Sequence, residues 1–152
     1  MLKHSLTVSH LKQSQQADCL AACTAMVLEY YDLSHPYQRL LSLLEIKPFG
    51  TPAPNVQRLI KLGVSVTYEA SSLEELEKHI ALNHPCIVFL DTGELPYWSE
   101  KTSHAVVVVG MDDHYVYVND PAFDKAPQSI SWGDFDLAWL ERGYYYAVVT
   151  PS

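Results

Sequence analysis

The sequence predicts an α+β domain in which helices come first and an antiparallel sheet follows. Apolar residues recur at helical spacing through residues 19–62. Residues 86–120 instead hold short runs of Val, Ile, Phe and Tyr, which are typical of strands. Two of these runs, 104–110 and 115–120, are separated by a short turn and predict a hairpin. This order of elements favours α+β over an alternating parallel fold.

The helical half begins at residues 19–31, which are rich in good helix formers and contain no Gly or Pro. Asp18 stands at the position of an N-cap for this helix. A second helix is predicted at 35–46 with Ser34 as its cap, and a short third helix at 55–62 that ends at a glycine.

The second half opens with alternating apolar residues at 64–68, which predict a strand. Ser72 and Glu75 then form the signature of a capping box, opening a helix that runs to about residue 82. The remaining predicted elements are a buried strand at 86–90, a polar loop at 91–103, the hairpin, an irregular segment at 122–130, a helix at 132–140 and a closing strand at 144–150.

Composition narrows the class of protein. A chain of 152 residues with 48% hydrophobic content predicts one domain over residues 1–152. The net charge of −8, with ten scattered Lys and Arg, argues against nucleic acid or an anionic membrane surface as a partner. No apolar run reaches the roughly 18 residues of a spanning helix, and the N-terminus lacks the apolar core of a signal peptide. We therefore expect a cytoplasmic protein.

Three cysteines, an odd number, argue against a disulfide framework and agree with a reducing compartment. A zinc site is also poorly supported, because no CxxC or HxxxH pair accompanies Cys19 and Cys23. We expect neither a metal nor a cofactor.

Cys19 is the candidate nucleophile. A thiol in the first turn of a helix faces unpaired backbone N–H groups and the positive end of the helix dipole, which favour the thiolate. The alternative is a small buried apolar residue, the commoner fate of a free cysteine. That alternative is the better interpretation for Cys23 and for Cys86.

His104 is the candidate base, because it stands at the head of a four-valine strand, where a polar residue has little packing reason to be. Alone, a histidine at such a position is more often a hydrogen-bonded residue of the sheet edge. Either Asn119 or Asp120, across the hairpin, could orient its ring. A three-residue loop at 111–113 sets His104 opposite Asp120, whereas a two-residue loop puts Asn119 on the face of His104. We predict the first register.

An acyl-transfer site also needs donors for the developing oxyanion. The Cys19 backbone N–H and the side-chain amide of Gln13 are candidates, with Gln15 and Gln16 as competitors. The loop at 91–103 carries Tyr97 and Trp98, a composition suited to contacting a ligand or to folding back on itself.

These residues resemble the bacteriocin-processing, double-glycine leader peptidase family of papain-like cysteine peptidases, over nearly the whole chain. The resemblance rests on the following matches: Gln13, Asp18-Cys19, the Ala-rich helix ending in Tyr30-Tyr31, His104 with its valines and Gly110, and the run from Tyr115 to Asp120-Pro121. It implies a papain-like fold, with an N-terminal helical half packed on a C-terminal antiparallel sheet. By the same resemblance Gln13 is the oxyanion-hole glutamine, Cys19 the nucleophile, His104 the general base and Asp120 the residue that orients it.

Two departures from the family pattern stand out. Members commonly have Gly after the cysteine, and here Leu20 takes that place, which alters the cleft beside the thiol. We expect Leu20, Tyr97 and Trp98 to contact the substrate. The best-known members are N-terminal domains of membrane ABC transporters that cleave after Gly-Gly. This chain carries neither spans nor an ATPase and looks more like the stand-alone bacterial members.

The predicted function is hydrolysis of a peptide bond by a Cys-His-Asp triad, with cleavage after small residues such as Gly-Gly. The expected partner is a peptide or protein substrate, and the sequence specifies no oligomeric state. Two alternatives stay open. The same triad could transfer the acyl group to an amine or thiol, or the chain could be an inactive peptide-binding domain of the same fold.

Overall fold

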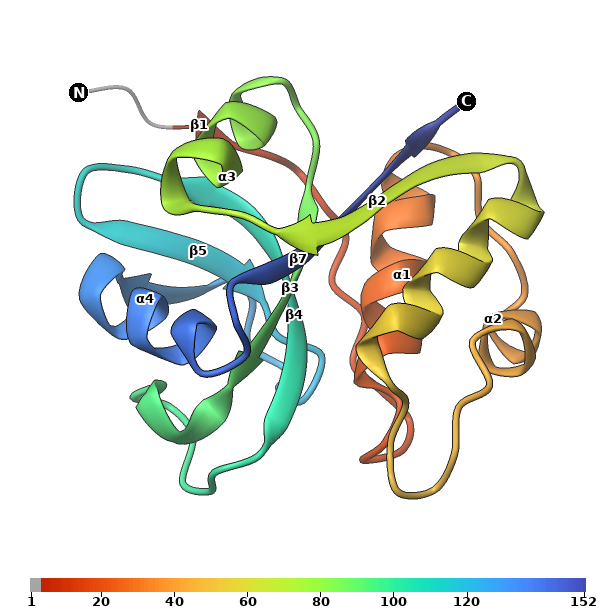
Figure 1. The fold of residues 1–152 in the computed structure, drawn as a ribbon, viewed down its shortest axis with the longest axis horizontal. Helices are drawn as coiled ribbons and strands as arrows, with labels where there is room; N and C mark the ends of the chain where they lie inside the picture. The colour runs from red at the N-terminus through yellow and green to blue at the C-terminus, as the bar shows by residue number, and fades with distance from the viewer. Residues whose placement is uncertain (1–3) are drawn as a thin grey trace.

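A computed structural model describes residues 4–152, and its centre is a seven-stranded sheet in which all paired strands are antiparallel (Figure 1). The strands are β1 His4–Ser5, β2 Val64–Ala70, β3 Cys86–Asp91, β4 Ser103–Met111, β5 Tyr115–Asn119, β6 Gln128–Ser131 and β7 Tyr145–Pro151. Their order in the sheet is β2-β7-β3-β4-β5-β6, and β1 pairs with β4. The predicted α+β class is confirmed.

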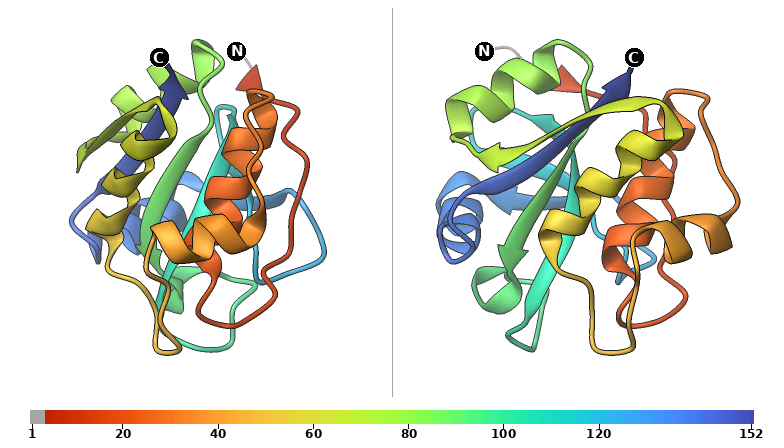
Figure 2. Two further views of the ribbon diagram at one scale, coloured as in Figure 1. Left: turned by 90° about the vertical axis from the view of Figure 1, so that its right-hand side faces the viewer. Right: turned by 45° about the vertical axis from the view of Figure 1, so that its right-hand side comes forward.

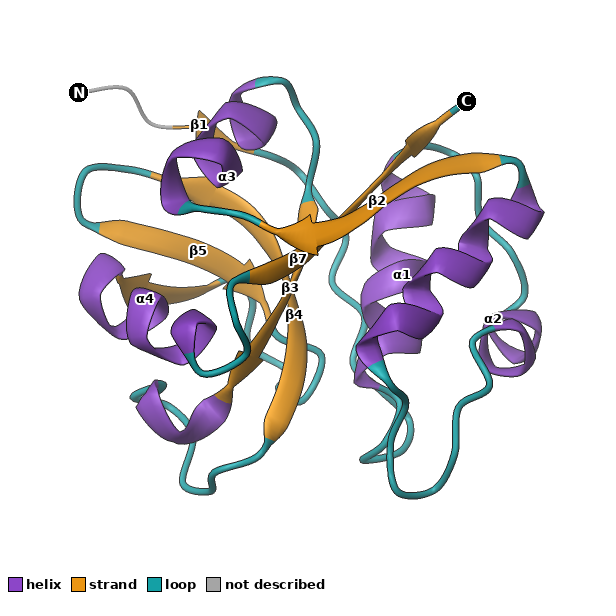
Figure 3. Ribbon diagram, viewed as in Figure 1, coloured by secondary structure: helices purple, strands orange, loops and turns teal. Residues whose placement is uncertain are grey.

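Helices cover both faces of this sheet (Figures 1, 2 and 3). They are α1 Cys19–Tyr30, α2 Tyr37–Leu43, the 3-10 helix η1 Ala53–Leu62, α3 Leu73–Ala81, the 3-10 turn η2 Thr92–Glu94 and α4 Trp132–Leu140. The first three lie on one face and share a core with Phe89 and Val107. The opposite face packs against α3 and α4 around Trp139 and Val106. The helical half therefore packs on the sheet as predicted, and the sheet also has a second helical layer.

Strand β4 is buried on both faces, which explains its unbroken run of valines. Successive side chains of a strand point to opposite faces. Val107 and Val109 accordingly enter the core beneath α1, whereas Val106 and Val108 enter the core beneath α3 and α4. A strand of this kind shows a continuous apolar run rather than an alternating pattern.

Two helix starts differ from the sequence prediction. Helix α2 begins at Tyr37 with Pro36 at its N-cap position, so the expected cap at Ser34 is wrong. The cause is the proline, which disfavours helical backbone in the residue before it. The third helix is a 3-10 helix that starts at Ala53, earlier than predicted, and it ends at the predicted glycine, Gly63, in the left-handed conformation.

Strand β6 lies in a segment predicted to be irregular. It pairs with β5, and only Gln128 and Ile130 of its four residues are buried. A strand this short, with two serines, carries too little alternation to stand out in the sequence. The predicted helix at 132–140 is present with the predicted bounds.

The hairpin of β4 and β5 has a different register from the predicted one. Near the turn Met111 pairs with Val116, and further along Val107 pairs with Asn119, with a shift of one residue between Val108 and Gly110. The predicted alignment of His104 directly opposite Asp120 is therefore wrong. The shift marks a β-bulge, an extra residue on one strand. Beyond the bulge, each residue of β4 shares a face of the sheet with a β5 residue one position away from the one it would otherwise match.

Candidate active site

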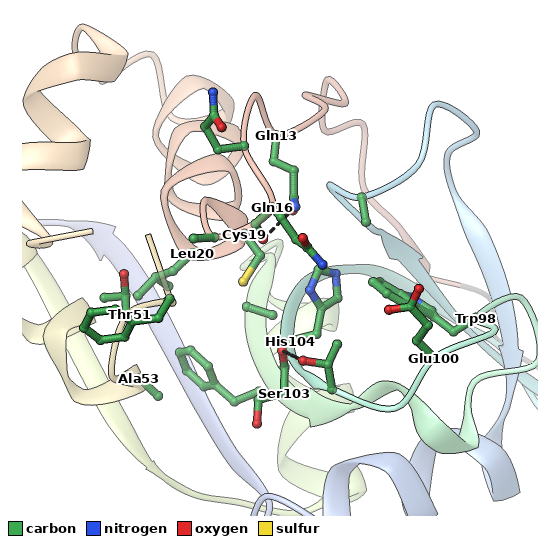
Figure 4. A pocket seen from close by; sticks show the side chains of 18 of the residues that line it. Gln13, Gln16, Cys19, Leu20, Thr51, Ala53, Trp98, Glu100, Ser103 and His104 are labelled. Carbon is green, nitrogen blue, oxygen red and sulfur yellow. Dashed lines mark hydrogen bonds between the residues drawn. The ribbon is translucent and has the colours of Figure 1, made fainter. Parts of the chain in front are cut away.

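The candidate site is a cleft of about 1030 Å³ at the start of α1. Cys19 and His104 approach one another at its floor, and the loop that carries Thr51 forms part of the facing wall (Figure 4). Gln13 and Trp98 also line the cleft. The structure thus brings one residue of the helical half and one residue of the sheet to a shared surface.

Cys19 is the first residue of α1, and its side chain is partly exposed. No hydrogen bond within residues 4–152 uses its backbone N–H, as expected for the first turn of a helix. The other two cysteines are fully buried. Burial raises the pKa of Cys86, and burial together with the nearby Cys19 and Asp120 raises the pKa of Cys23. Only Cys19 is placed to react with a molecule in the cleft.

Asp18 occupies the N-cap position of α1, but its side chain makes no capping hydrogen bond, which corrects the sequence prediction. Its Oδ2 instead accepts hydrogen bonds from the hydroxyls of Ser14, at 3.1 Å, and Tyr37, at 3.3 Å. The buried carboxylate therefore ties the chain before Cys19 to α2.

His104 lies at the head of β4 with only 5% of its surface exposed. Its Nε2 is 2.7 Å from Oδ1 of Asp120, which leaves Nδ1 for the Cys19 thiol. Burial alone would lower the pKa of His104. The hydrogen bonds and charges of Asp120 and Cys19 outweigh burial and raise that pKa to about 9. His104 is consequently protonated at neutral pH, although the ring is almost fully buried.

Asp120 is fully buried and accepts four hydrogen bonds. Besides His104, its Oδ1 accepts from the Ala122 N–H at 3.0 Å, and its Oδ2 accepts from Tyr97 Oη and Trp98 Nε1, both at 2.9 Å. Burial opposes ionisation here, but the hydrogen bonds from His104, Trp98 and Ala122 hold the pKa of Asp120 below its ordinary value. The carboxylate is charged and fixed in position.

The predicted contact between His104 and Asp120 is confirmed, although the predicted register is wrong. Because of the bulge, Asn119 sits opposite Val107 and faces α1, where its amide donates to the Val8 carbonyl at 3.1 Å. Asp120, the next residue, points to the other face of the sheet, which is the face of His104. The turn at 112–115 alone would put Asp120 on the face opposite to His104, and the bulge returns it to the predicted face.

Gln13 is held beside this group by two hydrogen bonds. Its backbone N–H donates to the Pro121 carbonyl at 2.8 Å, and its Nε2 donates to the Gln16 carbonyl at 3.0 Å. Figure 4 shows the Gln13 amide next to the start of α1. The two competitors, Gln15 and Gln16, also line the cleft, and both are exposed.

The three residues predicted to contact substrate all line the cleft. Leu20, in the first turn of α1, belongs to the core, and only 3% of its surface is exposed. The polar atoms of Tyr97 and Trp98 are bonded to Asp120. The sequence did not reveal these hydrogen bonds to Asp120, because no spacing along the chain relates residues in a long loop to an aspartate beyond the next hairpin.

Within residues 4–152, no group of three or more His, Cys, Asp or Glu side chains is arranged to hold a metal ion. None of the helices in the described part of the chain has the length and apolar character needed to cross a membrane.

Comparison with known proteins identifies the family. The sequence model of the peptidase C39 family matches residues 7–149. The chain belongs to the peptidase C39 family. Membership makes it a cysteine peptidase, in agreement with the enzyme class predicted from the sequence.

Two curated relatives are transport proteins. The lactococcin-G-processing and transport ATP-binding protein LagD of Lactococcus lactis is 30% identical over 84% of this chain. The sublancin-168-processing and transport ATP-binding protein SunT of Bacillus subtilis is 26% identical over 76% of this chain. The matches span only 17% and 16% of the length of these two relatives.

Solved structures of C39 peptidases share the fold. A putative C39-like peptidase from Bacillus anthracis superposes with a TM-score of 0.83 at 18% identity, covering 100% of this chain and 99% of that one. A double-glycine motif protease from an AMS/PCAT transporter, solved with a leader peptide, gives 0.78 at 24% identity and 100% coverage of both chains. The peptidase domain of Streptococcus ComA gives 0.79 at 21% identity, covering 96% of this chain and 100% of that one.

Proposed function

We propose that this C39 peptidase hydrolyses a peptide bond through a triad of Cys19, His104 and Asp120. The observation that carries the proposal is the buried 2.7 Å hydrogen bond between His104 Nε2 and Asp120 Oδ1, at a cleft where Cys19 meets the other side of the ring. This is the arrangement of nucleophile, base and orienting residue that acyl transfer needs.

The reaction starts from a proton held on His104 and a thiolate on Cys19. The thiolate sulfur attacks the carbonyl carbon of the scissile bond, and the carbonyl π electrons move onto oxygen to give a tetrahedral oxyanion. His104 then donates its Nδ1 proton to the leaving nitrogen as the C–N bond breaks. An amine departs and a thioester to Cys19 remains.

Water completes the cycle. Neutral His104 takes a proton from a water molecule, whose oxygen attacks the thioester carbonyl. The second tetrahedral species collapses, the C–S bond breaks, and the acid product leaves. The imidazolium and thiolate are thereby restored. Throughout these steps Asp120 stays ionised and holds the Nε2–H, so that the tautomer of His104 is the one the chemistry requires.

The oxyanion is proposed to bind the backbone N–H of Cys19 and the Nε2 of Gln13. Two facts support this role. The Cys19 N–H has no protein acceptor within residues 4–152, and only one Gln13 Nε2 hydrogen is used, on the Gln16 carbonyl. Removal of one such donor typically costs 10²–10³-fold in kcat.

For the substrate, we propose a leader peptide that ends in Gly-Gly. Two relatives are named for processing lactococcin G and sublancin-168, and one solved neighbour is in complex with a leader peptide. We further propose that residues 1–152 act as a single peptidase domain, which agrees with the family match over 7–149. We place its activity in the cytoplasm.

The test is incubation with a peptide library that includes Gly-Gly sequences, with cleavage sites read by mass spectrometry. We expect cleavage after small residues, with Gly-Gly preferred, and none with Cys19→Ala. A library left intact by protein whose Cys19 still reacts with iodoacetamide would contradict the peptidase proposal. Products carrying an added amine in place of water would instead indicate acyl transfer.

A further inference from the structure

The oxygen of Asp120 that does not face His104 is held by two neighbouring residues of one loop. Tyr97 Oη and Trp98 Nε1 both donate to Oδ2 at 2.9 Å. His104 and the Ala122 N–H use Oδ1. A carboxylate can accept about four hydrogen bonds, so Asp120 has no remaining capacity. Its plane cannot rotate without breaking several of these bonds.

Aromatic rings also enclose this hydrogen-bonded group. Phe123 packs edge-to-face on Tyr97 and on Trp98, with ring centroids at 5.2 and 5.3 Å. Trp98 in turn packs edge-to-face on His104 at 4.9 Å. With Asp120 fully buried and His104 nearly so, water is kept from the bond between them. A hydrogen bond to a charge is stronger in such surroundings, and an unpaired charge is correspondingly costly.

The loop that carries the two donors is itself fixed. The hydroxyl of the buried Thr92 donates to the Glu100 carbonyl at 2.6 Å and accepts from the Thr102 N–H at 2.9 Å. These bonds close the loop on both sides of Tyr97 and Trp98. The position of the two donors is therefore set by the fold, before any substrate binds.

We propose that Tyr97 and Trp98 are positioning residues, which hold one oxygen of Asp120 so that the other is presented to His104 as a charged acceptor. The proposal rests on the triad described above, and it gives Tyr97 and Trp98 a different task from the substrate contact predicted from the sequence. Because the indole N–H is the only polar group of Trp98, its polar function is already used on Asp120.

Loss of these donors has a defined direction. A hydrogen bond to a carboxylate favours the charged form, so its removal allows protonation of Asp120 at a higher pH. A protonated Asp120 no longer stabilises the imidazolium, and the thiolate of Cys19 then loses its counter-ion. The reactivity of Cys19 toward an electrophile should therefore fall first on the acid side of the pH profile.

The experiment measures the rate of Cys19 alkylation by iodoacetamide against pH, with the modified residue identified by mass spectrometry. The variants are Tyr97→Phe, Trp98→Phe, the double variant, and Asp120→Asn. Tyr115→Phe and Trp132→Phe are matched controls at the opposite end of β5, where the Trp132 indole donates to the Tyr115 carbonyl. We expect the acid limb of the double variant to move up by at least about one pH unit, with unchanged profiles for both controls.

The outcomes separate this inference from the proposed function. If Asp120→Asn leaves the profile unchanged, the triad itself is wrong. If Asp120→Asn moves the profile and the double variant does not, the triad stands and the positioning role is refuted. Should Trp98→Phe fail to fold, Tyr97→Phe decides, since it removes one oxygen and keeps the ring. A folded Tyr97→Phe variant with the wild-type acid limb would then overturn the inference.

Discussion

The charge on Asp120 sets the protonation of His104, and Asp120→Asn tests this directly. In the native site burial pulls the pKa of His104 down, while Asp120 and Cys19 raise it to about 9, against an ordinary value of 6.5. An asparagine removes the negative charge and leaves the burial unchanged. We therefore expect the pKa of His104 to fall from about 9 toward 6.5 in the variant, with the influence of Cys19 remaining.

The whole difference from about 9 to 6.5 corresponds to about 3 kcal/mol of stabilisation of the imidazolium, which is the most that the loss of the Asp120 charge can remove. At pH 7.5 nearly every wild-type molecule has a protonated His104, whereas at a pKa of 6.5 only about a tenth of the variant molecules would. The loss of charge alone thus predicts a fall of up to about tenfold in the reactive ion pair. The wrong tautomer adds to this, so we expect kcat to fall by orders of magnitude.

The assay is an NMR titration of the histidine rings, with the His104 signal among the seven identified by its loss in His104→Gln. Repeating the titration with Cys19→Ala separates the influence of the thiol from that of the carboxylate. A His104 that still titrates near pH 9 in Asp120→Asn would refute the reasoning, because burial and Cys19 would then suffice to hold the proton.

Three further predictions concern the same site. Gln13→Ala should lower kcat about 10²-fold with little change in KM, as measured by steady-state kinetics on the best library peptide. Iodoacetamide at neutral pH should modify Cys19 before Cys23 or Cys86. The opposite order in a peptide map would show that Cys19 is not the nucleophile. The folded-state pKa of Asp120 is lowered, so its stabilising effect is present above about pH 3.8 and is lost as the pH falls through the folded value. In the Cys19→Ala background, denaturant titrations should show this acid loss, and adding Asp120→Asn should remove it.

Most of the fold could be predicted from the sequence, because local patterns determined it. The helix after Cys19 and the capping box at Ser72 depend on residues within a few positions of one another. In the structure the Ser72 hydroxyl accepts from the Glu75 N–H at 3.1 Å, as the pattern implies. Strand β6 was missed because pairing with β5, rather than its own alternation, makes it a strand.

The site could be predicted less completely, since its contacts join distant segments. The contact of His104 with Asp120 follows from which residues share a face of the hairpin, although the structure reaches it through a different turn and a bulge near Val109. Asp18 was expected to cap α1, but a tertiary contact with Tyr37 takes its carboxylate. No local pattern could reveal such a competitor.

The position of β7 has a consequence for the order in which a newly made chain can fold. This last strand, at 145–151, lies between β2 and β3 and is hydrogen-bonded to both. On the ribosome, residues 64–91 emerge well before the segment that joins them, so the two parts of the sheet have no shared partner until synthesis passes residue 151. Cys19, His104 and Asp120 are all made before this strand, which joins β2 to the rest of the sheet. A chain truncated before residue 145 lacks this strand, so we expect β2 to be left without a partner, and the sheet, and with it the peptidase activity, to lose stability.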